Sequence, residues 1–217
     1  DRCLSRGLGD VYKRQTSPFG FGPNTHVLKH GEKIYALVEG GVSPVIMDSE
    51  MNFLEEEPFP AADNKRFTAH PKIDSDTGEM HAVSYDFGEY VNGLGQVHYV
   101  TVDSNGKLIK DQIIETPSRP MVHDCAITKN YVLIFDLPVT FSLGRRDDDN
   151  NPIGGDYPVV WNDKHTSRVG LQNKKTDEII WIEVNPGFLF HIVNSYEDDN
   201  GQVCLLYTSP SPRDKHR

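Results

Sequence analysis

The sequence has few cysteines and no long apolar run, and both shortages restrict what the protein can be. Three cysteines in 217 residues are too few for a disulfide framework or a cysteine-rich zinc site. No apolar stretch approaches the roughly 20 residues of a membrane-spanning helix, and no helical period of useful length is present. The low cysteine content suits a reducing compartment, so we expect a cytoplasmic protein.

The two ends of the chain differ in character from the part between them. Back-translating CLLYTSPSPRD, residues 204–214, and reading the opposite strand one base out of frame gives SRGLGDVYKRQ, residues 5–15. One DNA element read on opposite strands at both ends resembles a sequencing-library adapter that has been translated. We therefore interpret residues 1–15 and 204–217 as adapter-derived tails, and residues 16–203 as an open-ended part of a longer gene.

Basic residues are scarce in this central part. The whole chain has 22 Lys and Arg against 32 Asp and Glu. Without the seven basic and three acidic residues of the two tails, 15 basic and 29 acidic residues remain, a net charge of −14. Nucleic-acid partners usually require a basic face, so the charge balance argues against such a partner.

The sequence is rich in a recurring strand pattern. Alternating β-branched and aromatic runs are separated by short polar turns, whose Asn and Gly supply the positive φ that tight hairpins need. Hairpins are predicted over residues 26–40, 68–87, 96–115, 124–137, 168–184 and 188–203. Consecutive hairpins indicate an all-β sandwich, barrel or propeller, and their number alone does not decide among the three.

Two segments interrupt this pattern. Residues 49–65 are acidic and contain proline, and residues 144–157 read GRRDDDNNPIGGDY. The second segment has the acidity of a calcium loop but lacks the DxDxDG spacing and the terminal Glu of an EF-hand. We interpret it as a solvated surface loop.

Three of the nine histidines share an apolar context. His70, His123 and His191 lie in TAHPK, MVHDCAIT and FLFHIVNSYED. They are 53 and 68 residues apart, comparable to one blade or slightly more of a propeller with repeats of about 40–50 residues, so each blade could present one imidazole to a common axis. Spacing alone favours the plainer interpretation, in which each is a core histidine bonded to a backbone carbonyl. The other histidines of the central part are interpreted as surface or structural residues: His26, His30, His81, His98 and His165.

Six blocks of sequence carry a resemblance to a known family: NTHV, YALVEGG, TAHPKID, PSRPMVHDCAIT, YVLIFDLPVTF and FHIVNSYED. In this order and at this approximate spacing, the chain resembles the carotenoid cleavage oxygenases through essentially all of residues 16–203. The resemblance implies a fragment of a seven-bladed β-propeller, whose axis holds a non-haem Fe(II) ion bound by four histidines from four blades. His70, His123 and His191 match the first three ligands. The fourth lies near the C-terminus of the family, so this chain by itself is expected to be inactive.

The same resemblance gives Glu39, in LVEGG, a role beside the metal. It implies that the Glu39 carboxylate accepts a hydrogen bond from the distal N–H of a ligand histidine. A ligating imidazole must be neutral, correctly oriented and basic, and a carboxylate on its other nitrogen secures all three. Without the resemblance, a solvated carboxylate before a Gly-Gly turn is the preferred interpretation.

The activity implied by the resemblance is insertion of O2 across an activated C=C bond of a carotenoid or apocarotenoid, giving two carbonyl products. The implied partners are an apolar conjugated small molecule and O2, with peripheral membrane contact as a route to the substrate. Four neutral imidazoles leave an octahedral Fe(II) two open positions, and catalysis by metal and positioning needs no nucleophile triad. A non-catalytic propeller that has lost its iron is the competing hypothesis.

Two positions bear on the substrate. Relatives that cleave hydroxystilbenes carry a lysine directly before the glutamate matched by Glu39, where it meets the phenolic oxygen, and this chain has Val38 there. An apolar residue suits a polyene, so a carotenoid is preferred and a lignostilbene-type stilbene is the alternative. Cys125 stands where the family more often has Phe, so its small thiol either packs in the core or reshapes the tunnel wall. A metal-ligand role for Cys125, two residues from His123, is a further alternative.

Overall fold

The structure is a computed structural model that describes residues 23–56, 59, 67–87, 96–142 and 158–207. Every element whose bounds lie wholly within these ranges is a β-strand, so the all-β prediction is confirmed. Within the same ranges, no helix is long and apolar enough to cross a membrane.

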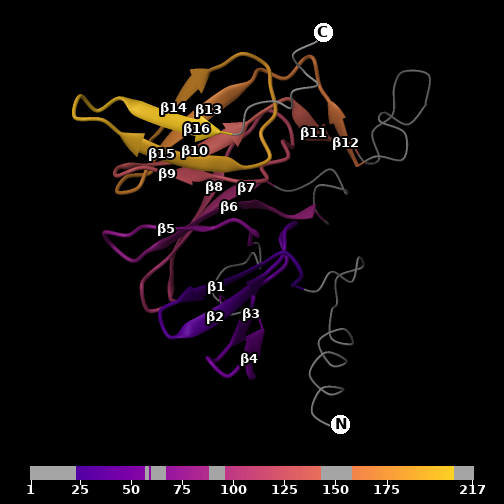
Figure 1. Cartoon of the computed structure of the whole chain (residues 1–217). Helices are drawn as coiled ribbons and strands as arrows, with labels where there is room; N and C mark the ends of the chain where they lie inside the picture. The colour runs from indigo at the N-terminus through magenta and orange to yellow at the C-terminus, as the bar shows by residue number, and fades with distance from the viewer. Residues whose placement is uncertain (1–22, 57–58, 60–66, 88–95, 143–157, 208–217) are drawn as a thin grey trace.

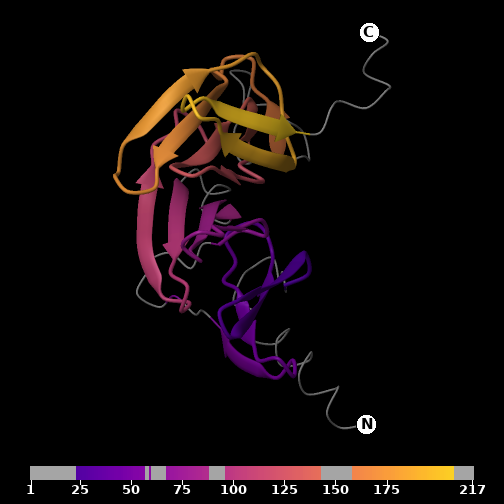
Figure 2. The same cartoon turned by 60° about the vertical axis from the view of Figure 1, so that its left-hand side comes forward.

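The strands form sheets that follow one another in chain order, from indigo to yellow in Figures 1 and 2. The first sheet contains β1 (His26–His30), β2 (Lys33–Leu37), β3 (Val45–Met47) and β4 (Phe53–Glu56). The second sheet contains β5 (Lys72–Ile73), β6 (Met80–Tyr85), β7 (Val97–Val102) and β8 (Leu108–Ile114). The third sheet contains β9 (Ala126–Ile127), β10 (Tyr131–Asp136), β13 (Arg168–Asn173) and β14 (Ile179–Glu183). Two hairpins complete the described part: β11 (Val139–Phe141) with β12 (Val159–Trp161), and the last hairpin, β15 (Ile192–Glu197) with β16 (Val203–Tyr207).

All six predicted hairpins are present as antiparallel pairs: β1–β2, β5–β6, β7–β8, β9–β10, β13–β14 and β15–β16. The turn between β7 and β8 shows why these hairpins could be predicted from the sequence. Gly106 has a φ of +83°, and a Cβ there would lie 2.8 Å from the Tyr35 hydroxyl. Asp103 Oδ1 accepts the backbone N–H groups of Asn105 and Lys107, each at 2.9 Å. Such turns are specified by a few adjacent residues.

The strand prediction failed at β4. This strand lies inside residues 49–65, which we interpreted as an interruption of the strand pattern, so that interpretation is wrong for residues 53–56. β4 is an edge strand with consecutive exposed apolar residues, Phe53 and Leu54, at 50% and 51% exposure. Its pairing with β3 also shifts register between Ile46 and Met47. A strand without inward and outward alternation gives no period-2 signal.

Strands β11 and β12 were also missed. Each is three residues long, and they pair with one another from the two sides of residues 143–157. The segment considered as a calcium loop, residues 144–157, lies outside the described residues. Pairing across such a long sequence separation leaves no hairpin signal in the sequence.

The central strands are buried on both faces. Along β6, Met80 and Ala82 pack in a core shared with the first sheet, whereas Val83 and Tyr85 pack in a core shared with the third sheet. Successive side chains of a strand point to opposite faces, so one strand serves two cores. β10 divides its apolar side chains in the same way, between the second sheet and the last hairpin. Sheets stacked face to face in this way are typical of propeller blades.

The interpretation of the chain ends as adapter-derived stays a prediction. Residues 1–22 and 208–217 lie outside the described part of the chain, while residues 204–207 belong to β16 and pair with β15. Strand pairing does not depend on where a sequence came from, so β16 does not test the interpretation.

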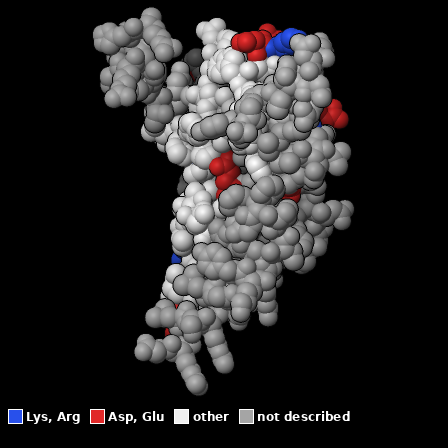
Figure 3. All heavy atoms as spheres, turned by 90° about the vertical axis from the view of Figure 1, so that its right-hand side faces the viewer, with Lys and Arg blue, Asp and Glu red and all other residues white. Residues whose placement is uncertain are grey.

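Among the described atoms of the face drawn in Figure 3, few belong to charged side chains. Acidic side chains appear near its middle and at its top, where basic side chains lie beside them. No broad basic surface is visible among the described atoms of this face, in keeping with the acidic composition.

Candidate metal centre

Three histidines from three different sheets meet at one point. His70 lies two residues before β5, His123 three residues before β9, and His191 directly before β15. Their ring centroids are 4.7, 4.9 and 5.0 Å apart, which makes a nearly equilateral triangle. The structure thus brings together the three histidines that the sequence analysis matched to metal ligands.

The ring nitrogens of this cluster fit a metal ion. One nitrogen from each ring lies within 4.8 Å of the other two, and His123 Nε2 is 3.2 Å from His191 Nε2. Two nitrogens that bind one ion at about 2.1 Å and at right angles lie about 3 Å apart. His70 Nε2 is buried and has no hydrogen-bond partner among the described residues. A buried polar atom without a partner costs free energy, and a metal ion would supply the missing partner.

His70 is held neutral by its surroundings. The pKa of His70 is lowered to about 4, chiefly by burial and next by the nearby positive charge of a protonated His123, while the charge of Asp124 acts in the opposite direction. The backbone of His70 is fixed as well, because its N–H donates to Thr68 Oγ1 at 3.2 Å and Pro71 restricts it to extended conformations. A ligating imidazole must be unprotonated, so His70 can bind a metal throughout the neutral range.

Glu39 lies behind His123. Its Oε2 is 2.6 Å from His123 Nδ1, the ring nitrogen remote from His191. Its Oε1 accepts a hydrogen bond from the Tyr85 hydroxyl at 2.8 Å. A carboxylate in this position keeps the proton on Nδ1 and leaves the Nε2 lone pair for a metal. Glu39 therefore lies beside one histidine of the cluster, where the resemblance led us to expect it.

Two glycines hold Glu39 in this place. Gly40 and Gly41 have φ angles of +87° and +85°, which residues with a Cβ rarely adopt. A Cβ on Gly41 would lie 2.7 Å from Asp86 Cα, and Gly40 O accepts the Phe87 N–H at 3.0 Å. The Gly-Gly pair thus lets the chain after β2 pass close to the end of β6, where Tyr85 meets Glu39.

Val38 and Cys125 are both buried. Val38 is 6% exposed, and Cys125 is 1% exposed in the core between the second and third sheets. Cys125 Sγ lies 3.9 Å from the His70 carbonyl oxygen and is not part of the histidine cluster. Burial raises the pKa of the Cys125 thiol to about 12, so it stays protonated, whereas a metal ligand must be a thiolate. The structure therefore favours core packing for Cys125, and its place in a substrate pocket stays a prediction.

The sequence analysis missed Asp124. Its side chain is 4% exposed and lies 2.7 Å from Lys72 Nζ. It also accepts the backbone N–H groups of Cys125 at 2.8 Å and Ile192 at 2.9 Å. The available signal was an acidic residue inside the apolar stretch MVHDCAIT, directly after a histidine.

Four of the remaining histidines are structural. His30, His81, His98 and His165 are buried, so the surface interpretation does not apply to them. Their partners are the Asp103 carbonyl, the Tyr99 hydroxyl, the Asp111 carboxylate and the Asp136 carboxylate. Each of these buried histidines therefore has a polar partner within the fold, as expected of a core histidine.

Comparison with known proteins assigns the family. The family model of the retinal pigment epithelial membrane protein matches residues 10–215. The chain belongs to this family of carotenoid cleavage oxygenases. A carotenoid cleavage oxygenase of Mycobacterium tuberculosis is 31% identical over 221 residues, covering 85% of this chain and 43% of that protein. The 9-cis-epoxycarotenoid dioxygenase NCED6 of Arabidopsis thaliana is 34% identical over 155 residues, covering 67% of this chain and 25% of that protein.

A solved structure agrees with the assignment. The lignostilbene dioxygenase of Pseudomonas brassicacearum superposes with a TM-score of 0.68 at 26% identity, covering 87% of this chain and 38% of that one. The predicted fold class of this carotenoid oxygenase family member, all-β and part of a propeller, is thereby confirmed. The chain spans between 25% and 43% of the length of these three proteins.

Proposed function

We propose that the protein containing this chain is a non-haem Fe(II) dioxygenase, which cleaves a C=C bond of a carotenoid or apocarotenoid with O2 and releases two carbonyl products. The observation that carries the proposal is the convergence of His70, His123 and His191 with Glu39 beside them. The names of the relatives, a carotenoid cleavage oxygenase and an epoxycarotenoid dioxygenase, support the reaction class.

The three histidines would hold the iron through the ring nitrogens that face one another. When bound, Fe(II) would supply the activation of O2 that this chemistry requires. His70 is neutral because of burial, and Glu39 keeps the remaining proton of His123 on Nδ1. The cluster therefore offers lone pairs without first having to lose a proton from His70.

Protein side chains would position the substrate and exclude water. Phe190 is 56% exposed, and its ring lies edge-on to His123 with centroids 5.3 Å apart. It is supported by Phe188, whose ring centroid is 4.9 Å away. An exposed aromatic face beside a ligand histidine is a suitable contact for an apolar conjugated chain. The contribution of these residues to rate would come from holding one double bond near the metal.

We infer a polyene substrate from Val38, which precedes Glu39 and is buried and apolar. Such a side chain cannot pair with a phenolate. The alternative, a stilbene substrate of the lignostilbene type, is favoured by the likeness to the lignostilbene dioxygenase. We further propose a cytoplasmic enzyme that contacts a membrane peripherally to reach its substrate, and the acidic composition argues against a nucleic-acid partner.

The proposal is tested in the longest gene product that contains this chain, purified with Fe(II) under O2. Aldehyde products from an apocarotenal and, separately, from a 4-hydroxystilbene are followed by chromatography. We expect cleavage of the apocarotenal that is lost in His70→Ala and retained in His98→Ala, a buried histidine outside the cluster. Cleavage of the stilbene alone would overturn the substrate. If neither compound reacts and no iron copurifies, a non-catalytic propeller scaffold is the better description.

A further inference from the structure

One buried carboxylate contacts all three segments that carry the clustered histidines. Asp124 Oδ1 lies 2.7 Å from Lys72 Nζ and accepts the Cys125 N–H at 2.8 Å. Asp124 Oδ2 accepts the Ile192 N–H at 2.9 Å. These contacts use both oxygens of the carboxylate. The contacts with Lys72 and Ile192 reach two other elements of the fold, and the contact with the Cys125 N–H fixes the backbone next to Asp124 itself.

Each contact is adjacent to a histidine of the cluster. Lys72 follows His70 by two residues at the start of β5, Asp124 directly follows His123, and Ile192 directly follows His191 at the start of β15. The second sheet, the third sheet and the last hairpin therefore meet at this carboxylate. Asp124 therefore fixes the distances between these elements at positions only one or two residues from the ligand histidines.

Burial makes these contacts interdependent. The Asp124 side chain is only 4% exposed, and a buried charge is tolerated only when it is paired and hydrogen-bonded. If one segment moved away, the carboxylate would lose a partner that water cannot easily replace. The contact of the neighbouring Cys125 Sγ with the His70 carbonyl oxygen is long by comparison, at 3.9 Å. Asp124 therefore has a larger influence on the arrangement than its neighbour.

We propose that Asp124 is the positioning residue of the three-histidine cluster: its carboxylate holds the three ligand segments at the spacing that a single metal ion requires. This inference rests on the proposed metal centre. It assigns to Asp124 no contact with metal or substrate, and predicts an effect on metal affinity through the positions of His70, His123 and His191.

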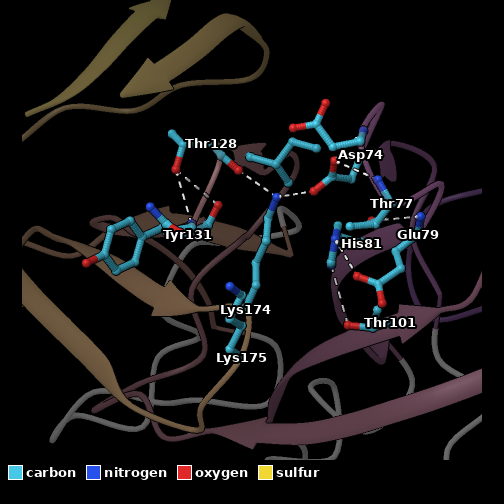
Figure 4. A network of polar contacts seen from close by, with 12 residues as sticks. Asp74, Thr77, Glu79, His81, Thr101, Thr128, Tyr131, Lys174 and Lys175 are labelled. Carbon is cyan, nitrogen blue, oxygen red and sulfur yellow. Dashed lines mark hydrogen bonds and ion pairs between the residues drawn. The ribbon is translucent and has the colours of Figure 1, made fainter. Parts of the chain in front are cut away.

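The chain contains a matched control for this residue. Asp74 lies directly after β5, at the end of that strand remote from His70, and its Oδ2 accepts a hydrogen bond from Lys174 Nζ at 2.6 Å. Lys174 also donates to the Thr128 carbonyl at 2.5 Å, so the ammonium joins the second and third sheets, as Figure 4 shows. This pair has the chemistry of Asp124 with Lys72 but touches no clustered histidine. Substituting Asp74 therefore measures how much stability is lost when a lysine–carboxylate contact between two sheets is removed away from the histidine cluster.

The test compares Asp124→Asn with Asp74→Asn in the longest gene product that contains this chain. Co(II) is the probe, because its visible absorption reports ligand geometry, and its dissociation constant is measured by competition with a chelator. We expect Asp124→Asn to weaken Co(II) binding about 10–100-fold, the range found for groups that orient ligands, and to change the absorption spectrum. Asp74→Asn should lower the midpoint of urea unfolding but keep the wild-type affinity and spectrum.

The outcomes separate this inference from the proposed function. If the wild type binds Co(II) and His70→Ala does not, the metal centre stands, and equal affinities of Asp124→Asn and the wild type would then overturn the role of Asp124. Equal losses in the two asparagine variants would overturn it too, since general destabilisation would explain both. If His70→Ala binds Co(II) as the wild type does, the metal centre and the inference fail together. Should Asp124→Asn not fold, Lys72→Met is compared with Lys174→Met, and weaker binding only in Lys72→Met supports the proposal, whereas equal binding overturns it.

Discussion

Glu39 and His123 lie 84 residues apart in the sequence, and their side chains approach within 2.6 Å. The contact joins the chain just after β2 of the first sheet to the chain just before β9 of the third, and the other oxygen of Glu39 accepts a hydrogen bond from the Tyr85 hydroxyl at the end of β6 in the second sheet. The orientation of one candidate ligand therefore depends on three sheets at once. Interference with any of them should be detectable at the metal centre.

Replacement of Glu39 by Gln should weaken metal binding about 10–100-fold. The amide removes the negative charge that favours a proton on His123 Nδ1, so the ring is less well held with Nε2 free. Isothermal titration with Co(II) measures the change. Glu178→Gln, at an exposed position in the third-sheet region, is the control and should bind as the wild type does. Unchanged affinity in Glu39→Gln would contradict the role given to this carboxylate.

Replacement of Val38 by Lys should shift the substrate preference toward hydroxystilbenes. An ammonium next to Glu39 can pair with a phenolate, which the buried Val38 cannot. We expect the rate with a 4-hydroxystilbene to rise about tenfold relative to an apocarotenal, equivalent to roughly 1.4 kcal/mol in the transition state. Val38→Met controls for the length of the side chain. A ratio that stays the same in both variants would show that this position does not select the substrate.

The stability of the metal-free protein should fall as the pH is lowered from about 6.5 to about 4. Burial lowers the pKa of His81 to about 4 from its ordinary value of 6.5, so in this window the unfolded chain binds a proton that the folded chain does not. The stability is complete above pH 6.5, and the loss levels off below pH 4 at about 3 kcal/mol for this residue. Urea unfolding of the wild type and His81→Gln at several pH values measures it. The variant should have the shallower pH dependence, and parallel curves would contradict the assignment.

Replacement of Gly41 by Ala should destabilise the protein by about 2 kcal/mol or more. The new Cβ would lie 2.7 Å from Asp86 Cα at a φ of +85°, so both crowding and backbone strain contribute. Metal affinity should fall as well, because the chain next to Glu39 must shift. Gly187→Ala is the matched control, since the nearest atom to its Cβ is 3.9 Å away. Equal thermal midpoints for the two variants would refute the crowding argument.

The thiol of Cys125 should be unreactive in the folded protein. It is 1% exposed, and burial raises its pKa to about 12, so neither access nor thiolate is available at neutral pH. Labelling with a disulfide reagent, followed by mass spectrometry, should modify Cys125 only in denaturant, with Cys204 as the more exposed internal comparison. Rapid native labelling of Cys125 would indicate an open path to this side chain, and would favour its place in a substrate pocket.

The hairpins could be predicted because their signals are local. A turn such as that of Asp103 and Gly106 is specified by neighbouring residues, and β-branched alternation runs through the strands beside it. Strand β4 was missed because its two exposed apolar residues, Phe53 and Leu54, are consecutive in the sequence, and β11 and β12 were missed because a long segment separates the two paired strands. The strands that were not predicted are those whose pairing is not specified by adjacent residues.

The candidate site could be predicted from the sequence only in part. Spacing alone did not indicate that His70, His123 and His191 converge, because their proximity depends on how whole sheets stack, and it was the family resemblance that pointed to them. Asp124 remained unnoticed even beside His123. Its partners Lys72 and Ile192 are 52 and 68 residues away, so its role exists only in the folded chain.

The two-faced burial of β6 makes the sheets energetically dependent on their neighbours. Its even-numbered apolar side chains belong to one core and its odd-numbered ones to the next, so unfolding the second sheet would remove one wall from each of two cores. Stability in such an array is approximately a sum of terms for each sheet and for each contact between adjacent sheets. A double-mutant cycle across β6, with Ala82 and Val83 as the two sites, would therefore measure how strongly successive interfaces are coupled.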